Sequence, residues 1–154
     1  MTEKLASVVV LDEQDDHLID IHRWADLARC SLASRNVRVG EVNLIFVEET
    51  QIHELNRLHM GKDRPTDVLS FPLDGPDAFS EDSLIGDIVV CPAVAAKNAA
   101  EHVGQDHHRG TIEDELALLV VHGVLHILGF DHMNDSDAEI MESIEQELLG
   151  AHYR

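Results

Sequence analysis

Three histidines lie within the eleven-residue stretch HGVLHILGFDH, and neutral imidazole is the commonest side-chain ligand of transition metals. His122 and His126 are four residues apart, so on a helix they lie one turn apart on the same face, where both rings reach one ion. His132 would lie on another face if the helix continued, but Gly129 permits a left-handed exit that turns the chain back. The spacing predicts a metal site formed by His122, His126 and His132.

Three imidazoles without a nearby fourth protein ligand are typical of a catalytic zinc site, in which water holds the fourth coordination position. The expected cofactor is therefore Zn²⁺, one ion per chain, with other divalent first-row metals as the alternative. A reading without metal makes each histidine a separately hydrogen-bonded polar residue on a buried helix. The matched spacing and the glycine between the second and third histidines disfavour that reading.

The same spacing occurs in the metzincin proteases, H-E-x-x-H-x-x-G-x-x-H, in which the glutamate is the general base. Gly123 stands in the place of that glutamate, so a metal-bound water has to be activated by the ion alone or by another group. A metzincin-like zinc metalloprotease lacking the usual glutamate is therefore the second function considered. A third is a non-enzymatic protein in which zinc only stabilises the fold, and the open coordination position argues against it.

The helix that carries the first two histidines is predicted from the apolar run ELALLVV (115–121) and a capping box at Thr111 and Asp114, and it extends to about Leu128. The remaining elements follow from apolar periodicity and turn signals. Strands are predicted at 7–12, 43–48, 67–73 and 86–91, and the other helices at 18–33, from Thr50, from Pro92 to about Val103, and from a Ser136–Glu139 capping box to Gly150. About four strands and five helices indicate one α+β or α/β domain over residues 1–154.

The composition is strongly acidic, with 30 Asp and Glu against 11 Lys and Arg and a formal net charge of −19 at pH 7. Such a charge repels nucleic acids and membranes at long range, so binding of RNA requires a local basic surface. The short apolar run near the start is followed at once by acids; neither a signal peptide nor a membrane span is expected, and the expected location is cytoplasmic. Cys30 and Cys91 lack a C-x-x-C spacing and are expected to be ordinary buried thiols.

Three segments together resemble the YbeY family of bacterial metal-dependent endoribonucleases: HGVLHILGFDH (122–132), RPTDVLSFPLD (64–74) and IGDIVVCP (85–92). They occur in the family's order, and the likeness extends over residues 43–149. The resemblance implies a zincin-like α+β single domain with a mixed sheet, and a zinc ion on the three motif histidines. It also implies a single-strand-specific endoribonuclease that acts in maturation of the 16S rRNA 3′ end and in ribosome quality control in the cytoplasm.

The partners that this resemblance implies are single-stranded RNA, chiefly rRNA, and the ribosome or ribosomal proteins. Neither DNA nor a membrane is expected as a partner. The third function then takes a more definite form, that of a zinc-stabilised ribosome-associated protein without enzymatic activity.

One position departs from the family pattern and bears on RNA binding. Family members often have an arginine in the segment before P-T-D-V-L-S-F, where this chain has Met60. If that arginine binds the scissile phosphate, its role here is either vacant or passes to Arg57, Lys62 or Arg64, which form a small basic cluster. Ser70, on the strand predicted next, is expected to line the cleft. The predicted RNA contacts are therefore Arg57, Lys62, Arg64 and Ser70.

The predicted catalytic residues are His122 and His126 together with Asp131, which directly precedes the third histidine. Asp131 either orients a ligand imidazole by accepting its second N–H or is an ordinary turn residue beside a glycine. His107 and His108 lie in a polar stretch, and they are expected to be solvated.

Overall fold

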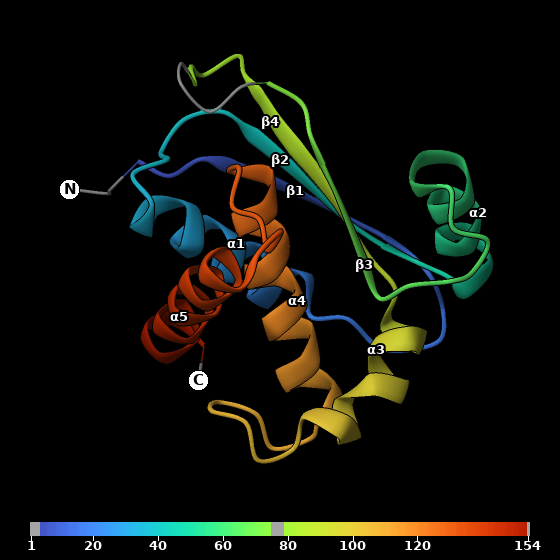
Figure 1. Cartoon of the computed structure of the whole chain (residues 1–154). Helices are drawn as coiled ribbons and strands as arrows, with labels where there is room; N and C mark the ends of the chain where they lie inside the picture. Colours follow the sequence, from blue (N-terminus) through green and yellow to red (C-terminus); the bar gives the residue numbers. More distant parts are fainter. Residues whose placement is uncertain (1–3, 75–78, 154) are drawn as a thin grey trace.

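The computed structural model describes residues 4–74 and 79–153, and a mixed sheet of four strands lies at its centre (Figure 1). The strands are β1 (Ser7–Glu13), β2 (Glu41–Val47), β3 (Val68–Pro72) and β4 (Leu84–Val90), in the spatial order β1-β2-β4-β3. β1, β2 and β4 run parallel, whereas β3 pairs antiparallel with β4 at the edge. β-Branched residues, as in the SVVV of β1, favour these segments because they pack well on a pleated surface.

Five α-helices flank the sheet in the described part of the chain. They are α1 (Ile21–Ser34), α2 (Glu49–Met60), α3 (Pro92–Ala99), α4 (Ile112–Ile127) and α5 (Asp135–His152), with a 3₁₀ turn, η2 (Ala100–His102), after α3. Figure 1 shows α1, α4 and α5 together on one side of the sheet and α2 on the other. Alternate residues of β2 serve the two sides: Leu44 and Phe46 belong to the main core, whereas Ile45 and Val47 belong to a smaller cluster under α2. The predicted α+β fold is confirmed.

The central helix, α4, is apolar almost all round and contacts α1, α3, α5, β3 and β4. Two glycines bring it unusually close to β4. A Cβ at Gly123 would lie 2.5 Å from Ile88 Cγ2, and a Cβ at Gly86 would lie 2.7 Å from Ile127 Cγ2. Both distances are shorter than carbon atoms tolerate, so neither position accepts a side chain without movement. Gly123, where the metzincins have their glutamate, therefore packs against the sheet.

The end of α5 is tied to the beginning of α4. The Tyr153 hydroxyl donates to Asp114 Oδ1, and Arg109 Nε donates to Oδ2 of the same carboxylate at 3.2 Å. Burial acts to raise the pKa of Asp114, but hydrogen bonds from Arg109 and Tyr153 outweigh it and hold that pKa well below its usual range. Tyr153 also stacks on Trp24 of α1, with ring centroids 6.1 Å apart. These contacts fix α5 against α4 and so position the α5 side chains beside the histidines.

The capping predictions had different outcomes at the two helices. Thr111 caps α4 as predicted, because its hydroxyl accepts from the Asp114 N–H at 3.1 Å. The capping box predicted at Ser136 is wrong: α5 begins earlier, and Asn134 Oδ1 accepts from the Asp137 N–H at 2.9 Å. Ser136 therefore lies inside the first turn of the helix.

The other predicted elements agree with the structure within about three residues at each end. The predicted cap at Thr50 is wrong, since α2 begins at Glu49. The helix from Pro92 continues as η2 close to its predicted end. Cys91 is buried as expected, whereas Cys30 is only partly buried. Within the described ranges, no helix combines the length and apolarity that crossing a bilayer requires.

Candidate metal centre

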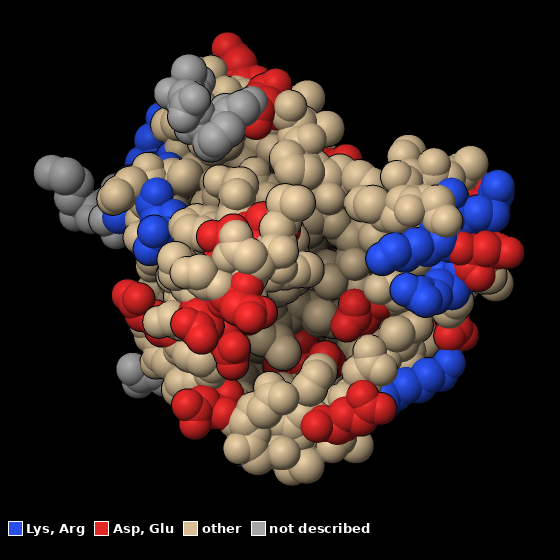
Figure 2. Space-filling model, viewed as in Figure 1, with Lys and Arg blue, Asp and Glu red and all other residues tan. Residues whose placement is uncertain are grey.

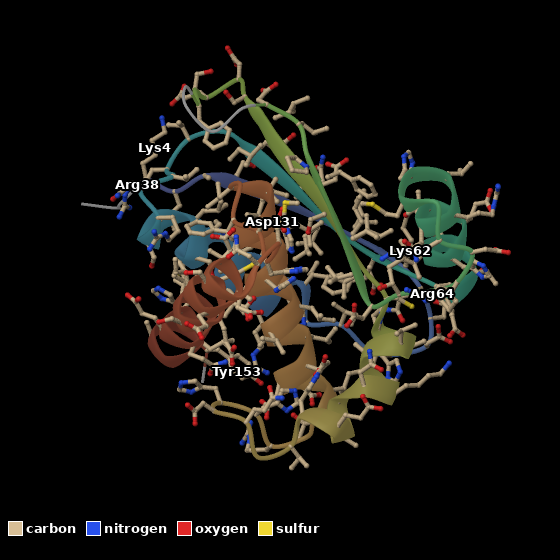
Figure 3. The ribbon with its side chains drawn as sticks, viewed as in Figure 1. Lys4, Arg38, Lys62, Arg64, Asp131 and Tyr153 are labelled. Atoms are coloured by element: carbon tan, nitrogen blue, oxygen red, sulfur yellow. The ribbon has the colours of Figure 1, made fainter. Side chains whose placement is uncertain are left out.

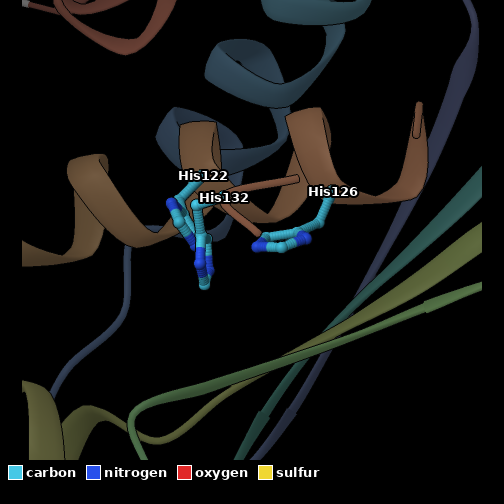
Figure 4. Close-up of side chains that lie close together, drawn as sticks. All are labelled: His122, His126 and His132. Carbon is cyan, nitrogen blue, oxygen red and sulfur yellow. The ribbon is translucent and has the colours of Figure 1, made fainter. Parts of the chain in front are cut away.

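Three histidine side chains point toward one another where α4 ends (Figure 4). His122 and His126 lie one turn apart on α4, with ring centroids 4.6 Å apart, and the His132 ring lies 5.2 Å from that of His126 and 5.9 Å from that of His122. One ring nitrogen from each residue lies within 4.8 Å of the others. Gly129, with a φ of +98°, reverses the chain in the predicted left-handed conformation and returns His132 to the helix.

Glu145 of α5 fixes the orientation of one of these rings. His122 Nδ1 donates to Glu145 Oε1 at 2.5 Å, and Glu145 is only 8% exposed. Because an ionised carboxylate only accepts hydrogen bonds, the proton lies on Nδ1, and the lone pair of His122 Nε2 is free for a metal. Sequence reasoning missed Glu145. Its signal was a glutamate on the buried face of α5, between Met141 and Leu148.

The protonation of the cluster also suits a metal. Burial lowers the pKa of His126, and the neighbouring His122 and His132 lower it further by repelling its positive form. Zinc binds imidazole in the neutral form, so this environment favours the state that a ligand needs. The donor set, three imidazoles with one tautomer fixed by Glu145, fits a zinc site with an open coordination position.

A cleft of about 400 Å³ opens beside the three histidines, and its other wall is formed by the end of α2, the following segment and β3. Met60, Lys62, Arg64 and Ser70 line this cleft. Figure 2 shows the hollow, with basic side chains at its α2 side, and Figure 3 places Lys62 and Arg64 there, across from Asp131. Within residues 4–74 and 79–153, neither the Lys62 nor the Arg64 side chain makes a hydrogen bond or ion pair. Both charges are therefore available to an anionic ligand.

Asn56 holds the basic segment in place. Its side chain is buried, and Nδ2 donates to the Arg64 carbonyl at 2.8 Å, while the main-chain carbonyl of Asn56 accepts from the Lys62 N–H at 3.3 Å. The side-chain bond and the main-chain bond together restrict the backbone from the end of α2 to Arg64. Sequence reasoning did not single out Asn56, because nothing in the local pattern distinguishes it from a surface asparagine.

Two predicted site residues lie in different surroundings. Arg57 Nη2 donates to Glu54 Oε1 at 2.5 Å, and Arg57 does not line the cleft. Asp131 is exposed, and its Oδ1 accepts from the backbone N–H of His132 at 2.7 Å. Glu145, not Asp131, contacts an imidazole of the cluster, so a catalytic role of Asp131 stays a prediction.

The expectation that His108 is solvated is wrong. His108 is 7% exposed, and its Nε2 donates to the fully buried carboxylate of Glu115 at 2.8 Å. His107, in contrast, is exposed as expected. The polar sequence around His108 suggested exposure, because it gives no sign that Glu115 of α4 binds this histidine inside the protein.

The fold and the site together define a class: an α+β domain whose central helix and following turn carry a three-histidine cluster beside a basic-edged cleft. The solution structure of TM1509 from Thermotoga maritima is similar, with a TM-score of 0.58 and 30% sequence identity, covering 94% of this chain and 90% of that one. The family model for Endoribonuclease YbeY matches residues 10–152, and the chain belongs to this family.

Curated relatives agree with the family assignment. Endoribonuclease YbeY of Pseudomonas putida strain F1 is 43% identical over 129 residues, which cover 84% of this chain and 76% of the relative. Endoribonuclease YbeY of Stutzerimonas stutzeri is 44% identical over 132 residues, covering 84% and 75% of the two chains. Family membership makes the chain an endoribonuclease, a hydrolase that acts on RNA.

Proposed function

We propose that the chain is a zinc-dependent endoribonuclease that cleaves single-stranded RNA in the cleft beside His122, His126 and His132. The observation that carries this proposal is the presence on one cleft of a three-imidazole donor set and two cations, Lys62 and Arg64, that have no partner among the described residues. A donor set alone would serve many hydrolases, but cations beside it favour a substrate with a phosphate backbone.

The residues of the chain have distinct roles in this reaction. Lys62 and Arg64 bind phosphate groups of the RNA, and Arg64 offers the paired N–H groups that match two phosphate oxygens. Asn56 keeps both in place, while Glu145 orients His122. When bound, zinc supplies a Lewis acid and lowers the pKa of a bound water to about 7. Ser70 lines the same cleft and offers its hydroxyl to the RNA.

The acidic character of the chain restricts where RNA is held. A net charge of −19 repels RNA from most of the surface, so the local basic edge decides the binding site. Figure 2 shows acidic side chains gathered on the opposite side of the hollow. This acidic surface suits basic ribosomal proteins, and we include the ribosome as partner.

We extend the proposal to the biological substrate: maturation of the 16S rRNA 3′ end and ribosome quality control in the cytoplasm. Its support is the relatives' name, Endoribonuclease YbeY, together with the resemblance of the three sequence motifs to that family. The metalloprotease alternative is disfavoured because Gly123 stands where those proteases have their general base.

The proposal is tested with purified chain, Zn²⁺ and matched single-stranded and duplex RNAs of one sequence. At limiting Zn²⁺ we expect cleavage of the single strand only, one zinc per chain at the three-histidine site, and loss of both that zinc and cleavage in His126→Ala, because two ligands hold the ion weakly. The control is His22→Ala, an exposed histidine on α1 outside the cleft. Mapping the product ends identifies the nucleophile, since a 2′,3′-cyclic phosphate requires attack by the 2′-OH. A folded His126→Ala variant that cleaves RNA at the parental rate would refute the proposal.

A further inference from the structure

A second group of potential ligands lies away from the three-histidine cluster. It consists of His102 from η2, His108 from the segment before α4, and Glu115 from the first turns of α4. One ligand atom from each lies within 4.8 Å of the others. His102 Nδ1 and His108 Nε2 both donate to Glu115 Oε1, at 2.6 and 2.8 Å. Three segments separated in the sequence thus direct polar atoms at one point inside the protein.

The carboxylate at the centre of this group lacks a partner for one of its two oxygens. Glu115 is fully buried, and its Oε2 has no hydrogen-bond partner. The nearby Arg109 is paired with Asp114. Among the described residues, the ion pairs of Glu115 are with His102 and His108 and none is with a lysine or arginine. A buried carboxylate with one unpartnered oxygen is costly unless an ion or a water occupies the remaining position.

We propose that His102, His108 and Glu115 bind a second divalent metal ion of the zinc type. Two imidazoles and a carboxylate are a donor set that zinc accepts, with Glu115 Oε1 nearest the two rings and Oε2 left without another partner. Tetrahedral zinc keeps ligand atoms about 3.3 Å apart at bond lengths of about 2.0–2.1 Å. The two imidazole nitrogens now lie 2.6 and 2.8 Å from Glu115 Oε1, so each has to move away from that oxygen by about 0.5–0.7 Å to admit an ion.

Binding requires each imidazole to move its proton to the other ring nitrogen. For His102 this is inexpensive, because its side chain is 31% exposed and water can accept the new N–H. For His108 it is not, because Nδ1 accepts from the Gly110 N–H at 3.0 Å, and a proton on Nδ1 breaks that hydrogen bond. The second site is therefore weaker than the three-histidine site and fills at higher metal concentration.

The two sites are separate and do not form a dinuclear centre. Glu115 and His122 are seven residues apart on α4, which places them on one face about 10 Å apart along the axis. Dinuclear catalytic ions lie about 3.5–4 Å apart. A cavity of about 190 Å³ lies between the sites, lined by His102 and Glu115 at one end and by His122 and Glu145 at the other. An ion on Glu115 joins η2 and the His108 segment to α4, and so stabilises one wall of that cavity.

The experiment is independent of RNA cleavage and uses the full chain with its first site removed by His126→Ala and His132→Ala. Equilibrium dialysis against Zn²⁺ alone, followed by elemental analysis, measures the bound metal. We expect about one zinc per chain in this background and none after His102→Gln is added, because two of three ligands then remain. In the otherwise unchanged chain, the same substitution should reduce about two zinc ions to about one.

The control is His107→Asn, a neighbour that lies outside the group. His107 has a φ of +61°, and asparagine tolerates this left-handed conformation, so the substitution preserves the backbone. This control should retain the second zinc. Circular dichroism establishes that each variant is folded. The proposal is overturned if a folded background binds no zinc, or if its bound zinc is the same with and without His102→Gln.

Discussion

The contact between Glu145 and His122 gives the sharpest test of the metal centre, through the substitution Glu145→Gln. Glutamine keeps the size of the side chain but removes the charge that holds the proton on His122 Nδ1 at 2.5 Å. Because Glu145 is 8% exposed, water does not compensate for the lost charge. Partners of ligand imidazoles are typically worth about 10–100-fold in metal affinity, and we expect a loss of that size, or about 1.4–2.8 kcal/mol.

The assay is competition for zinc between the protein and a chromophoric chelator, followed by RNA cleavage at limiting and at saturating zinc. Cleavage by Glu145→Gln should fall at limiting zinc and recover when zinc is added, since the three imidazoles remain. The matched control is Glu147→Gln, which removes the same charge from an exposed position of α5. If Glu145→Gln binds zinc as tightly as Glu147→Gln does, Glu145 does not orient a metal ligand, and the reasoning from tautomer to affinity is wrong.

Three further predictions follow from other parts of the structure. Replacing Lys62 and Arg64 together by alanine should weaken RNA binding and reduce the slope of log affinity against log salt by about 1.4, because each phosphate contact on a single strand contributes about 0.7; an unchanged slope would place the RNA elsewhere. Gly123→Ala should lower the free energy of unfolding by about 1–3 kcal/mol in urea titrations, because its Cβ overlaps a β4 side chain, and an unaltered midpoint would contradict that packing. Tyr153→Phe should cost about 1–2 kcal/mol at pH 7 by removing a donor to Asp114. The pKa of Asp114 is lowered on folding, so the stabilisation by this carboxylate is present above its unfolded pKa of about 3.9 and is lost as the pH falls below that value. The difference in unfolding free energy between Tyr153→Phe and the parent should therefore narrow in acid. A difference that stays constant with pH would show that the Tyr153 hydroxyl does not act through the Asp114 carboxylate.

Local rules were sufficient for the parts of the site that depend on local geometry. The spacing of His122 and His126 is a property of any α-helix, and Gly129 is the residue that a left-handed exit requires. The four strands were recognisable for the same reason, since their apolar patterns reflect two-fold alternation or complete burial.

The residues that sequence reasoning missed depend on tertiary contacts. Glu145 reaches His122 only because α5 packs on α4, and no spacing rule connects positions 23 residues apart. His108 is buried because Glu115 accepts a hydrogen bond from its Nε2, although its neighbours in the sequence are polar. The predicted start of α5 was wrong for a different reason. Asn134 and Ser136 are both residue types that favour helix caps, and the sequence pattern does not contain the contacts that decide between them.

α4 packs closely on β4 through Gly86 and Gly123, so the parts of the protein that position the histidines differ from the parts that line the rest of the cleft. The two glycines fix the position of α4, and with it the histidines, relative to the sheet. The opposite wall of the cleft therefore does not determine where the histidines lie. Met60 lies on that wall, where a substitution leaves the packing of α4 on β4 unchanged. Grafting a different segment between α2 and β3 is therefore a route to altered substrate preference that leaves the chemistry of the centre in place.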